Sequence, residues 1–440
     1  MSEQKPPKRT ETPGVTRVHD FVWADKAWCD PQQLTAKTLI EQLPRITGHF
    51  ALHRQTPDGA HVLARDLLGV NKLFYAIDGA QVVSSNFMFE LLDAGISLER
   101  IWSVPSGHAV QIEPQQKQLK LWPFQTLPDA GPVDTQSSAT AFQAKMAATF
   151  ERMAALRARS PVFVTLSGGL DSTTVAVHAK ACFDEVVGVT FALDSDAEQP
   201  GSDLASARAV AKALKMELMV IRPHPDDVVG LLDRVLRFGQ DWRDFNVHCG
   251  LVNAAVADGL RRALTDADAR PLVFTGDTMN ELVADYTAVK FGDQEYYKLP
   301  RLPLPTLRDF LIRGLDTGDR EVGLFASYGI DTIQPYALCA DVLGRLPEGL
   351  LGSGDAKQTL YKEAFGDRIP AHVYDRPKVR AQVGAANVPG GTLGLLVNRG
   401  IDSKALAQRF CELHGLQTTD LMRWIRAGRY RFTSSYPQEE

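Results

Sequence analysis

Short apolar runs separated by turn residues fill the first third of the chain. The runs cover residues 49–53, 59–64, 73–77, 81–84 and 109–112. Asp-Gly pairs at 58–59 and 78–79 interrupt them, and Asp-Gly between such runs is typical of β-hairpins. Residues 87–94 are expected to form a helix. The pattern predicts a small sheet-rich α+β domain over residues 16–125, after a polar, disordered lead at 1–15.

The pattern changes after residues 125–138, which are rich in Pro, Asp, Gly, Thr and Ser. Helical stretches then alternate with short β-branched strands, as in proteins with a parallel sheet. The expected strands are 162–166, 186–191, 217–221 and 272–275, and the expected helices are 139–157, 172–182, 203–214 and 251–264. Helices dominate from residue 308, and a basic amphipathic stretch follows at 403–431. The fold class is therefore α/β, with a parallel-sheet domain over residues 139–440.

Composition and charge narrow the function classes. The chain has 440 residues, 44% of them hydrophobic, and a formal net charge of −5. The apolar content suffices for a buried core, and the acidic balance disfavours nucleic acid as a partner. The five cysteines are dispersed and lack the spacing of a zinc site or a redox dithiol. Without a signal peptide or an apolar span, we expect a cytoplasmic protein that does not bind membranes.

The most specific motif joins an apolar strand to a helix rich in alanine and valine. It reads Leu166, Ser167, Gly168, Gly169, Leu170, Asp171, Ser172 and Thr173. Glycines let backbone N–H groups approach a phosphate, hydroxyl groups add donors, and a helix N-terminus attracts anions. Asp171 would repel a bare anion, so we expect it to hold Mg²⁺ against the phosphates. An ordinary strand-to-helix turn is the alternative.

This motif resembles the pyrophosphatase loop of the adenine-nucleotide alpha-hydrolase superfamily. The resemblance implies that ATP binds here and is cleaved between its α and β phosphates. It also implies that adenine lies against strand 186–191, which ends at Thr190 and Phe191. The motif lacks the Gly-Lys-Ser/Thr ending of a Walker loop, which disfavours transfer of the γ-phosphate.

Further matching segments lie on both sides of the nucleotide loop. They are residues 48–51, 63–75 and 105–108 in the first domain, and 274–281 and 357–378 in the second. These segments resemble the asparagine synthetase and β-lactam synthetase family, and the likeness covers most of residues 46–385. It implies a degenerate glutaminase-like domain at 16–125 and an ATP-pyrophosphatase synthetase domain at 139–440.

The first domain departs from the family members that use glutamine. Those members have a cysteine as the first residue of the mature chain, whereas Met1 is followed here by Ser2. Cys29 is the only cysteine in this domain, and we interpret it as structural. The departure predicts that the nitrogen does not come from glutamine and that the domain is a scaffold.

Asp277 takes the position where asparagine synthetases have Glu and β-lactam synthetases have Tyr. The resemblance places it, with Gly276, beside the acyl-adenylate, where a carboxylate could take a proton from an attacking amine. Capping of the next helix is the alternative for Asp277. The family's second magnesium carboxylate falls on Asn280, a weaker neutral ligand, and Glu281 or Asp277 could supply the missing charge.

The resemblance supplies further catalytic candidates. The glutamate of β-lactam synthetases falls near Asp319 and Glu321, which are candidates for a second acid/base partner; a solvated charge cluster is the alternative. Lys378 follows Arg376 and Pro377. It could stabilise charge on the α-phosphate and on the oxyanion of the collapsing adenylate. An exposed lysine at a helix end is the alternative.

These features predict an ATP-dependent carbon–nitrogen ligase that requires Mg²⁺. It would adenylate a carboxylate, release pyrophosphate and transfer the acyl group to an amine. Both substrates would be small molecules or peptides, and closure within one molecule would give a lactam. A lasso-type peptide cyclase, an ammonia-dependent enzyme similar to asparagine synthetase and a non-catalytic ATP-binding scaffold are the alternatives. A homodimer is left open.

Overall fold

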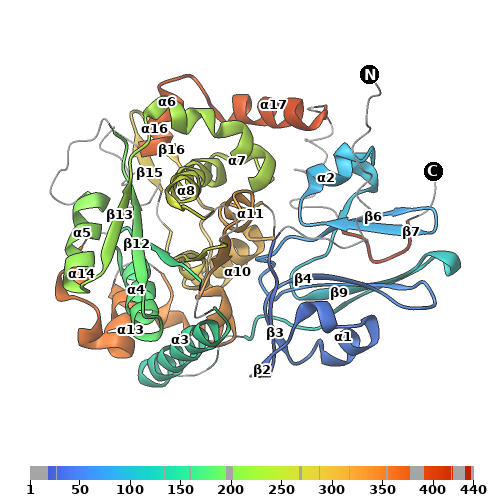
Figure 1. Ribbon diagram of the computed structural model, residues 1–440, viewed down its shortest axis with the longest axis horizontal. Helices are drawn as coiled ribbons and strands as arrows, with labels where there is room; N and C mark the ends of the chain where they lie inside the picture. The colour runs from blue at the N-terminus through green and yellow to red at the C-terminus, as the bar shows by residue number, and fades with distance from the viewer. Residues whose placement is uncertain are drawn as a thin grey trace.

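The computed structural model describes most of the chain. The described residues are 18–25, 27–129, 131, 134–157, 160–194, 202–266, 270–286, 288–316, 318–352, 355–376, 391–417, 419 and 432–437. They form two regions that lie side by side in Figure 1, a sheet-rich N-terminal region and a larger C-terminal region around a parallel sheet. The predicted lead at 1–15 and the candidate Lys378 lie outside the described residues.

The N-terminal region contains three antiparallel sheets, with strand orders β2-β1-β3, β10-β9-β5-β4 and β7-β6-β8. Its elements are β1 (Phe21–Ala24), β2 (Ala27–Trp28), α1 (Ala36–Gln42), β3 (Ile46–His49), β4 (Ala51–Gln55), β5 (His61–Arg65), β6 (Phe74–Asp78), β7 (Gln81–Ser85), α2 (Met88–Asp93), β8 (Trp102–Ser103), β9 (His108–Glu113) and β10 (Gln118–Pro123). Asp78 pairs with Gln81, and Gly79 turns the chain with φ of 58°. The Asp-Gly hairpin signal therefore marks a true turn here, because glycine adopts positive φ without strain.

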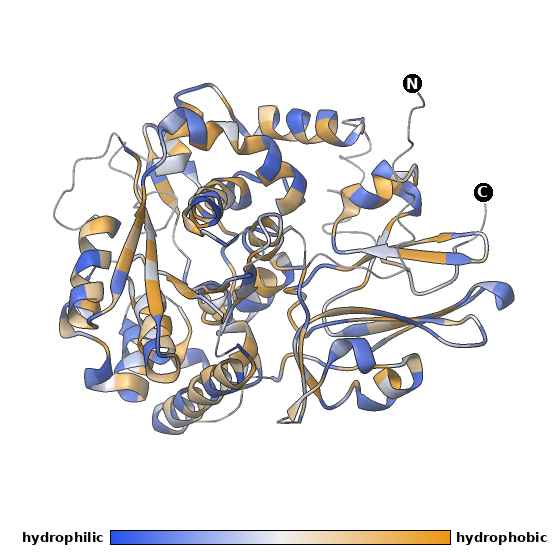
Figure 2. Cartoon of the chain, viewed as in Figure 1, coloured by the Kyte–Doolittle hydropathy of each residue, from blue (hydrophilic) through white to orange (hydrophobic). Residues whose placement is uncertain are grey.

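Five parallel strands form the sheet of the C-terminal region, in the order β13-β12-β11-β14-β17. Their bounds are β11 (Val162–Thr165), β12 (Val186–Phe191), β13 (Glu217–Ile221), β14 (Leu272–Phe274) and β17 (Asp331–Ile333). Side chains alternate between the two faces of a strand. Val162 and Val164 accordingly join one apolar cluster, whereas Phe163 between them joins the other. In Figure 2, strand β12 is drawn largely in orange, the colour of hydrophobic residues.

Helices cover both faces of this sheet (Figure 1). One face packs against α3 (Thr135–Arg157), α4 (Leu170–Cys182), α5 (Asp203–Ala213) and α13 (Asp355–Phe365). The other packs against α7 (Leu232–Gly239), α8 (Asp244–Ala263) and α11 (Val322–Ala326). The remaining elements are α6 (Pro225–Gly230), α9 (Met279–Leu282), β15 (Val289–Phe291), β16 (Gln294–Tyr296), α10 (Leu304–Gly314), α12 (Ala340–Leu343), α14 (Ala371–Tyr374), α16 (Gly391–Val397) and α17 (Ser403–His414). Among the described helices, none combines the length and the hydropathy needed to cross a bilayer.

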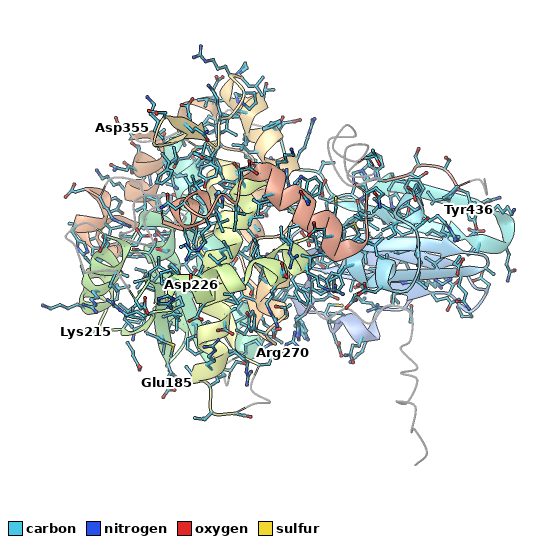
Figure 3. The ribbon with its side chains drawn as sticks, turned by 90° about the horizontal axis from the view of Figure 1, so that it is seen from above. Glu185, Lys215, Asp226, Arg270, Asp355 and Tyr436 are labelled. Carbon is cyan, nitrogen blue, oxygen red and sulfur yellow. The ribbon has the colours of Figure 1, made fainter. Side chains whose placement is uncertain are left out.

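The two regions share a buried interior. Phe21 and Phe87 of the N-terminal region belong to the same apolar cluster as Phe142 of α3. Gln240 adds a polar link, because its Oε1 accepts a hydrogen bond from the Met88 N–H at 2.6 Å and its amide donates to the Asn86 carbonyl at 3.0 Å. The C-terminal segment returns to this side, where Tyr436 packs against the N-terminal sheets (Figure 3).

The predicted fold class is confirmed, although several predicted ends are shifted. Helix α3 begins at Thr135 instead of residue 139, and α8 begins at Asp244 instead of 251. Helix α17 ends at His414, where Gly415 adopts positive φ as a helix C-cap. Residues 418 and 420–431 of the predicted basic stretch lie outside the described residues. Strand β1 and helix α1 were not predicted. Their short apolar runs depend on pairing and packing with distant residues such as β3.

Candidate functional site

A pocket of about 520 Å³ opens at the carboxyl ends of β11, β12 and β14. Ligands of open parallel sheets usually bind outside this edge, and the volume lies within the range of small-molecule sites. The candidate nucleotide residues that line the pocket are Leu166, Ser167, Gly169, Asp171, Ser172, Thr190, Phe191 and Gly276. One face of α8 forms the opposite wall with Phe245, Cys249, Val252, Asn253 and Val256. The predicted loop and the predicted adenine strand therefore meet at one pocket.

Gly168 and Gly169 have different structural roles in the loop. Gly168 has φ of +73°, and a Cβ atom there would lie 2.4 Å from the Ser206 backbone of α5. A side chain at residue 168 is excluded by conformation and by space. Gly169 has ordinary φ and looser surroundings, with Ser167 Oγ 3.3 Å from its virtual Cβ. Gly168 therefore seats the loop on α5, whereas Gly169 faces the pocket.

The loop hydroxyls hold the turn together. Ser167 Oγ and Ser172 Oγ lie 3.0 Å apart, and Ser172 Oγ also accepts the Ser167 N–H at 3.2 Å. Thr173 is fully buried and does not line the pocket. Our expectation of a phosphate donor at Thr173 is thereby corrected, because the helical turn directs this side chain into the core.

Asp171 lies at the centre of a polar cluster supplied mainly by α13. Its Oδ2 accepts the Lys357 ammonium at 2.6 Å, and its Oδ1 accepts the Tyr361 hydroxyl at 2.6 Å. The same ammonium lies 2.9 Å from Asn280 Oδ1 and 3.4 Å from Asp285 Oδ2. Oxygen atoms of these three residues thus converge on one cation.

The other side of the pocket is held by Arg320. Its Nε and Nη2 donate to the two carboxylate oxygens of Asp277 at 2.7 and 2.5 Å, and Nη2 also donates to Glu281 Oε1 at 2.7 Å. Tyr286 donates its hydroxyl to the same Glu281 oxygen. The guanidinium carbon lies 5.0 Å from the centre of the Phe245 ring, in the geometry of a cation–π contact.

Burial and charge act in opposite directions on these carboxyl groups. Burial raises the pKa of Asp277, and the Arg320 guanidinium opposes that rise. Burial also acts to raise the pKa of Glu281, but Arg320 and the Tyr286 hydroxyl outweigh it and lower that pKa. Arg320 therefore stabilises a buried carboxylate on each side of itself.

Glu321 also reaches this side of the pocket. Its Oε2 accepts hydrogen bonds from the Thr275 hydroxyl at 2.6 Å and from the Gln334 amide at 2.9 Å. Burial, followed by repulsion from Asp277, raises the pKa of Glu321 well above its usual range. Asp277 and Glu321 thus line one pocket in different surroundings. Asp277 is paired with a cation, whereas Glu321 accepts hydrogen bonds from neutral donors.

Residues 146–322 match the family model described as asparagine synthase. This part of the chain, 146–322, is thus similar to an asparagine synthase domain. The matched residues include the nucleotide loop, Asp277 and Arg320, which are the parts that meet in the pocket. The match supports an ATP-using, amide-forming ligase in general.

Similar solved structures are distant from this chain. An NH3-dependent NAD synthetase from Campylobacter jejuni subsp. jejuni is 18% identical over 34% of this chain and 60% of its own, with a TM-score of 0.25. An NMN synthetase from Francisella tularensis is 15% identical over 64% of this chain and 94% of its own, with a TM-score of 0.30. A glutamine-dependent NAD+ synthetase from Acinetobacter baumannii is 15% identical over 76% and 53%, with a TM-score of 0.28. No curated protein sequence matches the chain significantly.

The predicted metal ligands of the asparagine synthase domain do not all converge. Glu281 was expected to supply charge to Mg²⁺, but it does not line the pocket and its Oε1 accepts hydrogen bonds from Arg320 and Tyr286, so that expectation is corrected. Asp171 and Asn280 do fit, because their oxygens already share one cation and Mg²⁺ often takes only one or two protein ligands beside phosphates. Among the described residues, no group of three or more His, Cys, Asp or Glu could hold a metal ion.

Two other candidates have different surroundings. Asp319 does not line the pocket, because its carboxylate accepts the backbone N–H groups of Glu321 and Gly323 at 2.8 and 2.7 Å. It is a helix cap, which corrects the expectation of an acid/base role. Lys378 lies outside the described residues, although nearby Arg376 donates to the Ser167 carbonyl at 3.0 Å and so contacts the nucleotide loop.

Sequence reasoning missed several residues of the asparagine synthase domain and its surroundings. Asp285 was not among the candidates, yet it is buried beside Lys357. Lys357 and Tyr361 both reach Asp171, and their spacing of four on α13 places them on one helical face. That spacing, inside the segment that resembles the family, was the available signal. Arg320 was passed over between the two acidic candidates.

We predict that Glu321→Gln becomes more stable relative to the wild type as pH rises. The folded-state pKa of Glu321 is raised, so its protonated side chain stabilises the folded state. This stabilisation is complete below the unfolded-state pKa of about 4.3 and is lost as pH rises through the folded-state pKa. Urea unfolding at about pH 5 and about pH 7.5 should show this, with a slope of at most about 1.4 kcal/mol per pH unit. The exposed Glu185→Gln is the control (Figure 3). A pH-independent difference for Glu321→Gln would show that this carboxyl is ionised throughout.

Proposed function

We propose that this protein adenylates a carboxylate with ATP, releasing pyrophosphate, and transfers the acyl group to an amine. The observation that carries the proposal is the shared pocket, in which the nucleotide loop and the Asp277–Arg320 pair face each other. A nucleotide on the loop would place its α-phosphate between these groups. The asparagine synthase domain supports ligation in general, and the pocket supports this chemistry in particular.

The loop side would bind and activate ATP. Asp171 and Asn280 would hold Mg²⁺, which neutralises the departing pyrophosphate when it is bound. Lys357 already contacts both residues and supplies a second positive charge at the same place. Adenine would lie against the end of β12, where Thr190 and Phe191 line the pocket.

The opposite side would handle the proton of the amine. Asp277 is the proposed base, and Arg320 orients it through two hydrogen bonds. The raised pKa of Glu321, caused by burial and by repulsion from Asp277, favours its protonated form, which could act as an acid beside the Asp277 base. Two carboxyl groups whose surroundings favour different protonation states are a common basis for acid/base chemistry. Lys378 is proposed to stabilise the oxyanion.

The amine is proposed to come from a source other than glutamine. Glutamine hydrolysis by a cysteine requires a reactive thiolate. Cys29 is the only cysteine in the described N-terminal region, and burial, followed by the charge of Asp30, raises the pKa of its thiol. Its Sγ contacts Gln42 Oε1 at 3.8 Å, on α1. These surroundings favour a structural cysteine.

The source of the amine divides the proposal into three variants. The amine is free ammonia, a second substrate, or a group on the same molecule, and the last would give a lactam. The pocket volume of about 520 Å³ favours small molecules over the peptide substrate of a lasso-type cyclase.

A non-catalytic scaffold is disfavoured because the charged residues of the pocket are kept in ion pairs, Asp171 with Lys357 and Asp277 with Arg320.

The first test is ATP turnover with a panel of amino acids and β-amino acids. At least one carboxylate should release AMP and pyrophosphate, and Asp171→Asn should lower that rate by about three decades, because a lost charge ligand removes several kcal/mol of stabilisation. Asp184→Asn, an exposed change beyond the other end of α4, is the matched control. Turnover of Asp171→Asn within tenfold of the wild type would contradict the assignment of the loop.

A second prediction separates activation from acyl transfer. Asp277→Asn should keep the exchange of labelled pyrophosphate into ATP, because adenylation needs no base for the amine. Product formation should fall by about two decades or more, the usual effect of losing a general base. The exposed Asp293→Asn serves as the control. Product formation at the normal rate would make Asp277 a positioning group for Arg320, and Glu321 would then be the next candidate.

A further inference from the structure

Two buried cations of the N-terminal region reach the segment that carries Arg320 and Glu321. Lys72 donates its ammonium to the Leu315 carbonyl and to the Gly69 carbonyl, the latter at 2.9 Å. Arg65 Nη1 lies 3.2 Å from Asp316 Oδ1. Both cations are almost fully buried, with 5% and 1% of their surface exposed. Water therefore cannot replace these contacts.

Arg65 is held in place by hydrogen bonds within the N-terminal region, in addition to its contact with Asp316. Its guanidinium donates to the carbonyls of Asn71 at 2.8 Å, Val104 at 2.9 Å and Gly69 at 2.6 Å. Asp316 Oδ1 also accepts the Ser106 N–H at 3.1 Å. The N-terminal region thus presents a rigid, charged surface to Asp316, because the fork of a guanidinium allows few orientations.

The far end of the same segment is held by the C-terminal region. The Asp319 N–H donates to the Gly239 carbonyl at 2.7 Å, and the Asp319 carboxylate caps α11. Gly318 has φ of +85°, and a Cβ atom there would lie 2.4 Å from Asp241 Oδ2. Arg320 and Glu321 follow directly. Their position in the pocket therefore depends on a segment held at both ends.

Charge adds to these contacts. Burial, followed by repulsion from Arg65, lowers the pKa of Lys72 to about 8, and the carboxylates of Asp319 and Asp316 oppose that shift. Removing the ammonium would leave the Leu315 carbonyl without this donor and would leave buried carboxylates less well balanced. Buried polar groups without partners are costly, so the segment would relax toward another conformation.

We propose that the N-terminal region positions the reaction centre, with Lys72 and Arg65 holding Leu315 and Asp316 so that Arg320 and Glu321 enter the pocket. Both cations are positioning residues, since neither lines the pocket. Only the predicted effect on catalysis rests on the proposed function. The physical claim, that Lys72 orders this segment, can be tested without a substrate.

The test is hydrogen–deuterium exchange by mass spectrometry on full-length Lys72→Met, which keeps most of the side-chain volume. Backbone amides in residues 318–326 should exchange about tenfold faster, equivalent to losing one charge-assisted hydrogen bond of about 1.4 kcal/mol. Residues 162–175, which contain the nucleotide loop, should keep their wild-type rates. Lys72→Arg should restore most of the protection because it returns the positive charge.

Two further variants guard against a folding defect. Lys145→Met removes the 2.7 Å ion pair between Lys145 of α3 and Asp341 of α12, and should leave hydrogen exchange in residues 318–326 unchanged. Asp316→Asn keeps an acceptor for the Ser106 N–H but weakens the contact with Arg65, and should loosen the same segment. Unchanged exchange in both folded Lys72→Met and Asp316→Asn overturns the proposal. So does an equal acceleration in residues 162–175, which would indicate general destabilisation.

The catalytic consequence has its own measurement. With a carboxylate that the wild type activates, Lys72→Met should lower product formation about tenfold while the KM for ATP stays within about twofold, since the contacts of Lys72 are remote from the nucleotide loop. A matched loss in both parameters overturns the positioning role. If the wild type activates no carboxylate, the proposed function fails, whereas the exchange experiment still decides whether Lys72 orders the segment.

Discussion

The pocket depends on one positive charge placed between two buried carboxylates. Asp277 and Glu281 come from the turn after β14 and from α9, and their charges would repel each other without Arg320. Isolated buried charges cost several kcal/mol, and pairing with a guanidinium offsets that cost only when the geometry is good. Arg320 satisfies this condition with two hydrogen bonds to Asp277 and one to Glu281. Arg320 therefore favours the ionised form of both carboxyl groups against the effect of their burial.

The position of Arg320 links the pocket to the rest of the molecule. The residue is held beside α8, where Asn253 donates to its carbonyl at 2.7 Å. Leu315 and Asp316, before it in the chain, contact Lys72 and Arg65 of the N-terminal region, and α11 begins two residues after it. The N-terminal region carries none of the proposed catalytic groups. It can still affect the reaction, because it contacts the segment that positions Arg320.

The sequence predicted those features that depend on neighbours along the chain. Alternating apolar residues located β11 and β12, and the motif from Ser167 to Ser172 located the nucleotide loop, because glycine spacing and a following helix are local signals. Gly168 shows the limit of this reasoning. Its glycine is required by Ser206 of α5, which no local pattern reveals.

Distant partners account for the wrong or missing assignments. Glu281 was expected to bind Mg²⁺, but its true partner, Arg320, lies 39 residues later in the chain. Asp285 was not proposed for the site because Lys357, 72 residues away, could not be paired with it by spacing alone. Asp319 and Glu321 differ by two residues yet point to a helix end and to the pocket, respectively. Side-chain direction in a loop follows from the fold around it.

The most direct test of the central claim is the fate of oxygen from the carboxylate substrate. An acyl-adenylate forms when a carboxylate oxygen attacks the α-phosphorus, and that bridging oxygen leaves with AMP when the amine takes the acyl group. A substrate labelled with ¹⁸O in its carboxylate should therefore yield AMP that carries one heavy oxygen, detectable by mass spectrometry. Formation of the amide with unlabelled AMP would contradict the account.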